Sequence, residues 1–209
     1  TFYEPYAGSA AISLEMLARG HVKSVVLIEK DPLLYAFWYS VIYHTDELCN
    51  MIMDINIDID TWVSFQHYRE SLNPNDYPLV KMAVAALFYN RTNYSGILSA
   101  GPIGGMEQNS AYKIDCRFNK SKQIMQIREI AEYKESLSVY HDDAISFLKK
   151  NYDKSQNEFS MVYLDPPYYG QGKRLYRYYY EDKEHKQLAN FIKGKKYPWL
   201  ISYDDHPEV

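Results

Sequence analysis

Blocks of hydrophobic and polar residues along the chain predict strands that alternate with helices. Thr1–Tyr6 forms an apolar strand, and a tight turn leads to a helix over Ser9–Gly20, with Ser9 as the expected N-cap. A second apolar strand, Ser24–Pro32, ends on acidic residues and is followed by a strongly apolar helix over Leu33–Cys49. This β-α-β-α order favours a parallel sheet with right-handed crossovers.

The middle of the chain has a different pattern. It is irregular and helical, and it contains a long segment rich in Gly, Asn and Ser over Phe88–Asn109, a kind of loop that is usually functional. The alternating order resumes with a strand and helix over Ser136–Asn151, a buried strand over Phe159–Tyr169, an amphipathic helix over Glu181–Gly194 and a last strand from Tyr197. We therefore expect residues 1–50 and 135–209 to form one domain, with residues 51–134 as an insertion.

Acidic side chains stand at the ends of four predicted strands: Glu4, Glu29, Asp143 and Asp165. In an open α/β sheet, ligands bind outside the carboxyl ends of the strands. Each acid alone also fits a helix N-cap, a reading that suits Asp143 and also Asp31. Four such acids around one crevice favour a polar ligand.

The turn after the first strand narrows the choice of ligand. It carries one glycine, Gly8, and not the three of a dinucleotide-binding loop, and the chain has no P-loop motif. Glu29 is placed to accept hydrogen bonds from a pair of ribose hydroxyls. A nucleoside cofactor without a phosphate chain fits these features best.

Composition and charge set further limits. The chain has 209 residues, enough for one domain with a subdomain, and 22 of them are tyrosines, which suit stacking and interfaces. The net charge is −4, the two cysteines do not make a disulfide framework, no apolar run reaches membrane-span length, and the histidines show no metal-ligand spacing. The chain starts without Met on an apparent strand, so we expect a piece of a longer protein. From the cysteines and histidines we expect a cytoplasmic protein without a metal.

Two short motifs resemble the DNA adenine methylase family, the Dam-like N6-adenine methyltransferases. They are EPYAG at Glu4–Gly8 and DPPY at Asp165–Tyr168, and the likeness extends to Phe88–Gly105, HDDA at His141–Ala144 and the closing WLISYDD. The resemblance implies S-adenosylmethionine as cofactor. It also implies a Rossmann-like methyltransferase sheet with helices on both faces and an inserted, mostly helical target-recognition subdomain.

The resemblance also implies where the cofactor binds. The candidate residues are Glu4, Pro5, Tyr6, Ala7, Gly8, Glu29, Asp143 and Asp165. The chain departs from the family pattern at Ala10, where a second glycine is usual and where a methyl group would crowd the methionine part of the cofactor. A Lys- and Gly-rich segment that precedes the first strand in the family is also missing from this sequence.

The DPPY motif supplies the chemistry that an adenine amine needs. The amine is a poor nucleophile because its lone pair is delocalised into the ring, so two hydrogen-bond acceptors must draw it toward sp3 geometry. Asp165 offers a carboxylate, Pro166 offers a carbonyl that Pro167 holds in place, and Tyr168 offers a face for stacking. The target base lies inside a duplex and must be flipped out. The same motif can also be explained without catalysis, as a capping aspartate in a proline turn with two surface tyrosines.

Contact with duplex DNA is expected from the insertion and from the loop after DPPY. Between Lys113 and Arg128 there are five basic residues and one acid, a local balance of 5 − 1 = +4. The candidate DNA-binding residues are Asn90, Arg91, Tyr94, Lys113, Arg117, Lys173 and Arg174. A solvated helix face or a surface loop would explain the same basic residues.

Three other functions stay open at this stage: methylation of cytosine N4, methylation of adenine in RNA, and DNA binding on a methyltransferase fold without turnover. We expect a monomer, with a cognate restriction enzyme as a possible partner in the same system.

Overall fold

The chain divides into two units in the computed structural model, which describes residues 1–151 and 159–207. The first, here called the sheet unit, combines Thr1–Lys30 with Glu135–Val209, and the second, the helical unit, is Asp31–Lys134. Residues 31–50, which the sequence analysis grouped with the sheet, are part of the helical unit because the helix that follows Asp31 packs against the helices of the insertion.

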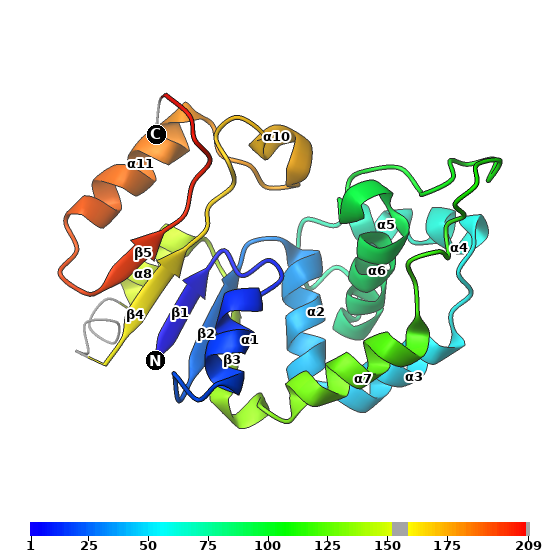
Figure 1. Ribbon diagram of the computed structural model, residues 1–209, viewed down its shortest axis with the longest axis horizontal. Coiled ribbons are helices and arrows are strands. Elements are labelled where there is room, and N and C mark those ends of the chain that lie inside the picture. Colours follow the sequence, from blue (N-terminus) through cyan, green and yellow to red (C-terminus); the bar gives the residue numbers. More distant parts are fainter. Residues whose placement is uncertain (152–158, 208–209) are drawn as a thin grey trace. The chain divides into compact units, whose positions relative to one another are not determined.

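The sheet unit is built on parallel strands in the order β3-β2-β1-β4-β5. Figure 1 shows these strands side by side. Their bounds are β1 Phe2–Pro5, β2 Val25–Glu29, β3 Leu137–His141, β4 Met161–Leu164 and β5 Trp199–Ile201. The chain moves outward from β1 through β2 to β3 and then returns to β4 on the other side of β1, so the strand order reverses between β1 and β4. The predicted α/β fold with a parallel sheet is confirmed.

The two faces of this sheet are covered by different helices. The face that carries Tyr3 and Ile28 packs against α8 and α11, which supply Phe147, Leu148 and Ile192 to a common core. Figure 1 shows α1 on the opposite face. This arrangement follows from right-handed crossovers, because the chain passes from β1 to β2 in one direction and from β3 to β4 in the other. Among the described residues, the helices of the unit are α1 Ala11–Ala18, α8 Ala144–Lys150, α10 Gly172–Leu175 and α11 Asp182–Lys193.

The helical unit has its own core, centred on α6. Phe88, Tyr89 and Met82 of this helix are fully buried, and Leu33 of α2 and Leu48 of α3 belong to the same cluster. The elements of the unit are α2 Pro32–Tyr43, α3 Thr45–Asp54, α4 Ile59–Ser64, α5 Gln66–Glu70, α6 Leu79–Thr92, η1 Tyr94–Gly96 and α7 Lys120–Ala131, with η2 Lys134–Ser136 joining the units.

The structure differs from the sequence-based elements in two places. The helix expected over 33–49 is interrupted at His44, whose φ of −134° and ψ of 36° are not helical, and α3 then begins with Asp46 and Glu47 in its first turn. Ser9 is not the N-cap of α1; Ala10 occupies that position and no side chain caps the helix. The expectation for Ser9 rested on residue type alone, and the turn geometry overrides it.

Candidate active site

The carboxyl edge of the sheet brings Glu4 and Asp165 toward each other at the point where the strand order reverses. Glu4 is the third residue of β1, one residue before the strand ends at Pro5. Its side chain accepts a hydrogen bond from the backbone N–H of Ser13 at 3.2 Å. Burial raises the pKa of Glu4 to about 7, and the negative charge of Asp165 adds to the rise.

The turn after β1 is held by Glu29 at the end of β2. The backbone N–H of Gly8 donates to Oε2 of Glu29 at 3.0 Å, and Oε1 accepts from the N–H of Lys30 at 2.9 Å. Gly8 has φ +47°, which favours glycine, and a Cβ there would meet only the Tyr6 carbonyl at 3.9 Å. Glu29 therefore ties the turn after β1 to the end of β2.

Pro5, Ala7 and Ala10 fix the rest of the same turn. Pro5 ends β1 opposite Ile28, and the N–H of Ala7 donates to the Ile28 carbonyl at 3.2 Å. Ala10 is fully buried with φ 50° and ψ 26°, a left-handed conformation that costs an alanine more than a glycine. Ala10 therefore adopts, with strain, a backbone conformation that a glycine at this position would adopt freely.

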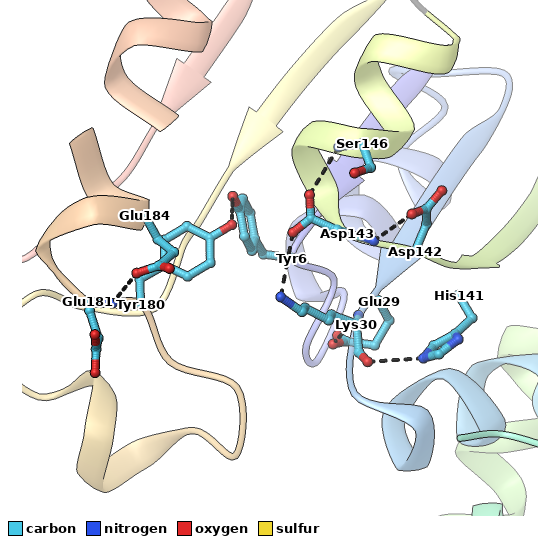
Figure 2. A network of polar contacts seen from close by, with 10 residues as sticks. All are labelled: Tyr6, Glu29, Lys30, His141, Asp142, Asp143, Ser146, Tyr180, Glu181 and Glu184. Carbon is cyan, nitrogen blue, oxygen red and sulfur yellow. Dashed lines mark hydrogen bonds and ion pairs between the residues drawn. The ribbon is translucent and has the colours of Figure 1, made fainter. Parts of the chain in front are cut away.

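Figure 2 shows the polar network beside this turn. Asp143 caps α8 by accepting from the N–H of Ser146 at 3.0 Å, and its other oxygen lies 3.7 Å from Nζ of Lys30. The hydroxyls of Tyr6 and Tyr180 are 2.8 Å apart. Burial, followed by the neighbouring Tyr180, raises the pKa of Tyr6 well above its ordinary value, so this hydroxyl stays neutral. The capping role weighed for Asp143 is present in the structure.

The DPPY motif forms an extended loop after β4. Pro166 and Pro167 are buried, whereas Asp165 and Tyr168 are half-buried. The ring of Tyr168 meets that of Tyr176 edge-on, with centroids 6.3 Å apart. The Tyr168 carbonyl accepts from the N–H of Gly172 at 2.8 Å, which ties the loop to α10. Lys173 and Arg174 lie exposed on that short helix.

The helical unit gathers several of the DNA-binding candidates at the end of α6. Both Nε and Nη2 of Arg91 donate to the carbonyl of Arg117, at 3.1 and 2.9 Å. Nδ2 of Asn90 donates to the Gly96 carbonyl at 3.3 Å, and Nη2 of Arg117 lies 3.9 Å from where a Cβ on Gly96 would be. Asn90 and Arg117 are exposed, so their polar groups are open to a ligand, whereas Arg91 joins the two ends of the loop.

Tyr94 and Lys113 lie further along the same loop. The Tyr94 side chain is 72% exposed, and Lys113 is exposed with its Nζ bonded to the carbonyl of Gln108. These two residues therefore have accessible side chains, one aromatic and one cationic.

Asn93 is a residue of this loop that the sequence analysis did not select. It is fully buried, its Oδ1 accepts from Nε1 of Trp62 at 2.7 Å, and its Nδ2 donates to the carbonyls of Ile97 and Leu98, each at 3.0 Å. The NRTN run gave no sign of which asparagine turns inward. The sequence also gave no sign of Ser202 and Asp204, which follow β5. Ser202 contacts Asp165, and Asp204 contacts the backbone of Tyr169 just after the DPPY motif.

No three or more His, Cys, Asp or Glu side chains in residues 1–151 and 159–207 are grouped so that they could hold a metal ion. In the same ranges, no helix has the length and apolar character needed to cross a membrane.

Comparison with known proteins bears on the whole chain. A search of curated proteins finds no match. The family model of the D12 class N6 adenine-specific DNA methyltransferases matches residues 1–209. This match agrees with the DPPY loop, the parallel sheet and the acids at its carboxyl edge. The chain therefore belongs to the D12 class of N6 adenine-specific DNA methyltransferases and is an adenine-specific DNA methyltransferase.

Proposed function

We propose that the enzyme transfers a methyl group from S-adenosylmethionine to N6 of an adenine flipped out of duplex DNA. The observation that carries the proposal is the meeting of Glu4 and Asp165 where the strand order reverses, the place where open α/β sheets bind ligands. In this proposal the cofactor is held by Glu4–Gly8, Glu29 and Asp143, and the flipped base by Asp165, Pro166 and Tyr168.

The polar groups and the turn at the carboxyl edge of the sheet fit such a cofactor. Glu29 presents a carboxylate at the end of β2, the position where open α/β sheets receive ribose hydroxyls. The Gly8 turn leaves room for a close approach, since a Cβ would meet nothing nearer than 3.9 Å. The carboxyl groups of Glu4 and Asp165 offer negative charge to a cationic group. When bound, S-adenosylmethionine supplies an electrophilic methyl group on a positively charged sulfur.

The chain's own residues then position the amine. The Asp165 carboxylate and the Pro166 carbonyl accept the two N–H bonds of N6, which directs its lone pair to one side of the base. Tyr168 offers its ring to the face of the adenine. These groups work by orientation and electrostatics, without a covalent intermediate. Asp165 acts as a hydrogen-bond acceptor in this scheme, and the proton that N6 loses on gaining the methyl group passes to solvent.

Contact with duplex DNA is assigned to side chains in both units. Asn90, Tyr94, Lys113 and Arg117 are exposed in the helical unit, and Lys173 and Arg174 are exposed in the sheet unit. Arg91 joins the loop that carries the first group. The monomeric state of the enzyme and a cognate restriction enzyme as its partner stay predictions.

The test supplies S-adenosylmethionine labelled in its methyl group to duplex DNA of mixed sequence and, in a separate reaction, to RNA of the same sequence. Digestion of the labelled DNA should place the label in N6-methyl-2′-deoxyadenosine. We expect Asp165→Ala to lower the rate by at least about 10²–10³-fold while DNA affinity stays near that of the parent enzyme. Asp205→Ala, at an exposed carboxylate nearby, is the matched control and should retain activity. Label in cytosine, in RNA only or in no nucleic acid would each contradict the proposal.

A further inference from the structure

The segment that follows β5 lies beside the DPPY loop that follows β4. The two strands pair in parallel, with Leu164 opposite Ile201, and the N–H of Ser202 donates to the Leu164 carbonyl at 2.9 Å. Because neighbouring parallel strands end together, Ser202–Asp204 and Asp165–Gly170 emerge at the same edge of the sheet.

Ser202 contacts the reacting carboxylate itself. Its Oγ lies 2.5 Å from Oδ1 of Asp165 and 3.0 Å from the hydroxyl of Tyr163. Ser202 donates its single hydroxyl proton to Asp165, so the Tyr163 hydroxyl donates to Ser202. This chain of two bonds restrains the orientation of the Asp165 carboxylate.

Asp204 holds the other end of the loop. Its Oδ1 accepts from the backbone N–H of Tyr169 at 2.8 Å, and its Oδ2 accepts from that of Gly170 at 2.9 Å. Partial burial acts to raise the pKa of Asp204, but the hydrogen bonds from Gly170 and Tyr169 outweigh it and the pKa lies below its ordinary value. The two consecutive N–H groups thus bind an ionised carboxylate in bidentate fashion.

We propose that Ser202 and Asp204 are positioning residues that fix the DPPY loop at both of its ends. Ser202 orients the Asp165 carboxylate, and Asp204 anchors the backbone just after Tyr168. The two prolines between these points stiffen the loop, so that its acceptors are preorganised for the adenine amine. This inference rests on the proposed function.

A separation of rate from binding tests the role of Ser202. Ser202→Ala should lower the single-turnover methyl-transfer rate by about 10–100-fold, the effect of losing a group that orients a reacting side chain. The dissociation constants of cofactor and DNA should change by less than about threefold. Ser202→Thr keeps the hydroxyl and should recover most of the rate. Equal losses of rate and affinity, or no rescue by threonine, would overturn the assignment.

A second measurement does not depend on turnover. Hydrogen exchange of the Tyr169 and Gly170 amides, followed by NMR, should be faster by about tenfold or more in Asp204→Asn, because an amide side chain has one acceptor oxygen for two donors. Asp205→Asn, at the exposed neighbour, should leave both rates unchanged.

The outcomes keep this inference apart from the proposed function. Unchanged amide exchange in Asp204→Asn would overturn the clamp even if the parent enzyme methylates DNA. Faster exchange together with a parent enzyme that methylates no DNA would support the clamp and refute the proposed function.

Discussion

Replacement of Glu4 by glutamine should stabilise the ligand-free protein by an amount that grows as the pH rises from about 4.5 to about 7. The Glu4 side chain is 4% exposed, and burial raises its pKa from the ordinary value of 4.5 to about 7. The ionised form is therefore costly in the folded state. Glutamine has nearly the same shape and can still accept from the N–H of Ser13, but it carries no charge.

The size of the effect follows from the linkage between protonation and folding. A rise of the pKa from 4.5 to about 7 corresponds to about 3 kcal/mol at 1.36 kcal/mol for each pKa unit. Below pH 4.5 Glu4 is protonated in both the folded and the unfolded chain, and its contribution to stability is fully present. Between pH 4.5 and 7 only the folded state keeps the proton, so stability falls as pH rises. Above pH 7 Glu4 is ionised in both states, and the folded state is destabilised by the full amount of about 3 kcal/mol.

Urea unfolding at pH 4.5, 5.5, 6.5 and 8 would measure this difference directly. The gap between Glu4→Gln and the parent protein should grow with pH and reach about 3 kcal/mol at pH 8. Glu135→Gln, at an exposed position of the sheet unit, is the matched control and should show no such growth. A constant gap over the four pH values would refute the assignment of a raised pKa to Glu4.

Two further substitutions test the framework of each unit. Asn93→Ala should lower the free energy of urea unfolding by roughly 3 kcal/mol, because it leaves the buried Trp62 indole N–H and two carbonyls without their partner; a loss under about 0.5 kcal/mol would contradict this. Asp143→Ala should cost about 1 kcal/mol through loss of the bond from Ser146 at the start of α8. Asp143→Asn should stay near the parent in the same thermal or urea measurement, and an equal loss in both variants would argue against capping.

The sequence by itself determined the class of fold and the family. Apolar runs that end on Glu29 and Asp165, separated by amphipathic helices, specify a parallel sheet because strand and helix periodicities are local properties of the chain. The DPPY and EPYAG motifs likewise mark the carboxyl edge, since turn residues and acids at strand ends are readable without contacts. The candidate catalytic and cofactor-binding residues come from these motifs, and their roles stay predictions.

Only the tertiary structure decided which polar groups face one another. The grouping of residues 31–50 with the helical unit, the inward turn of Asn93 and the contact of Ser202 with Asp165 all join segments distant in the sequence. The raised pKa of Glu4 has the same origin, because burial depends on what packs around a side chain. Local pattern fixes where a strand ends, and long-range packing fixes what its last residues touch.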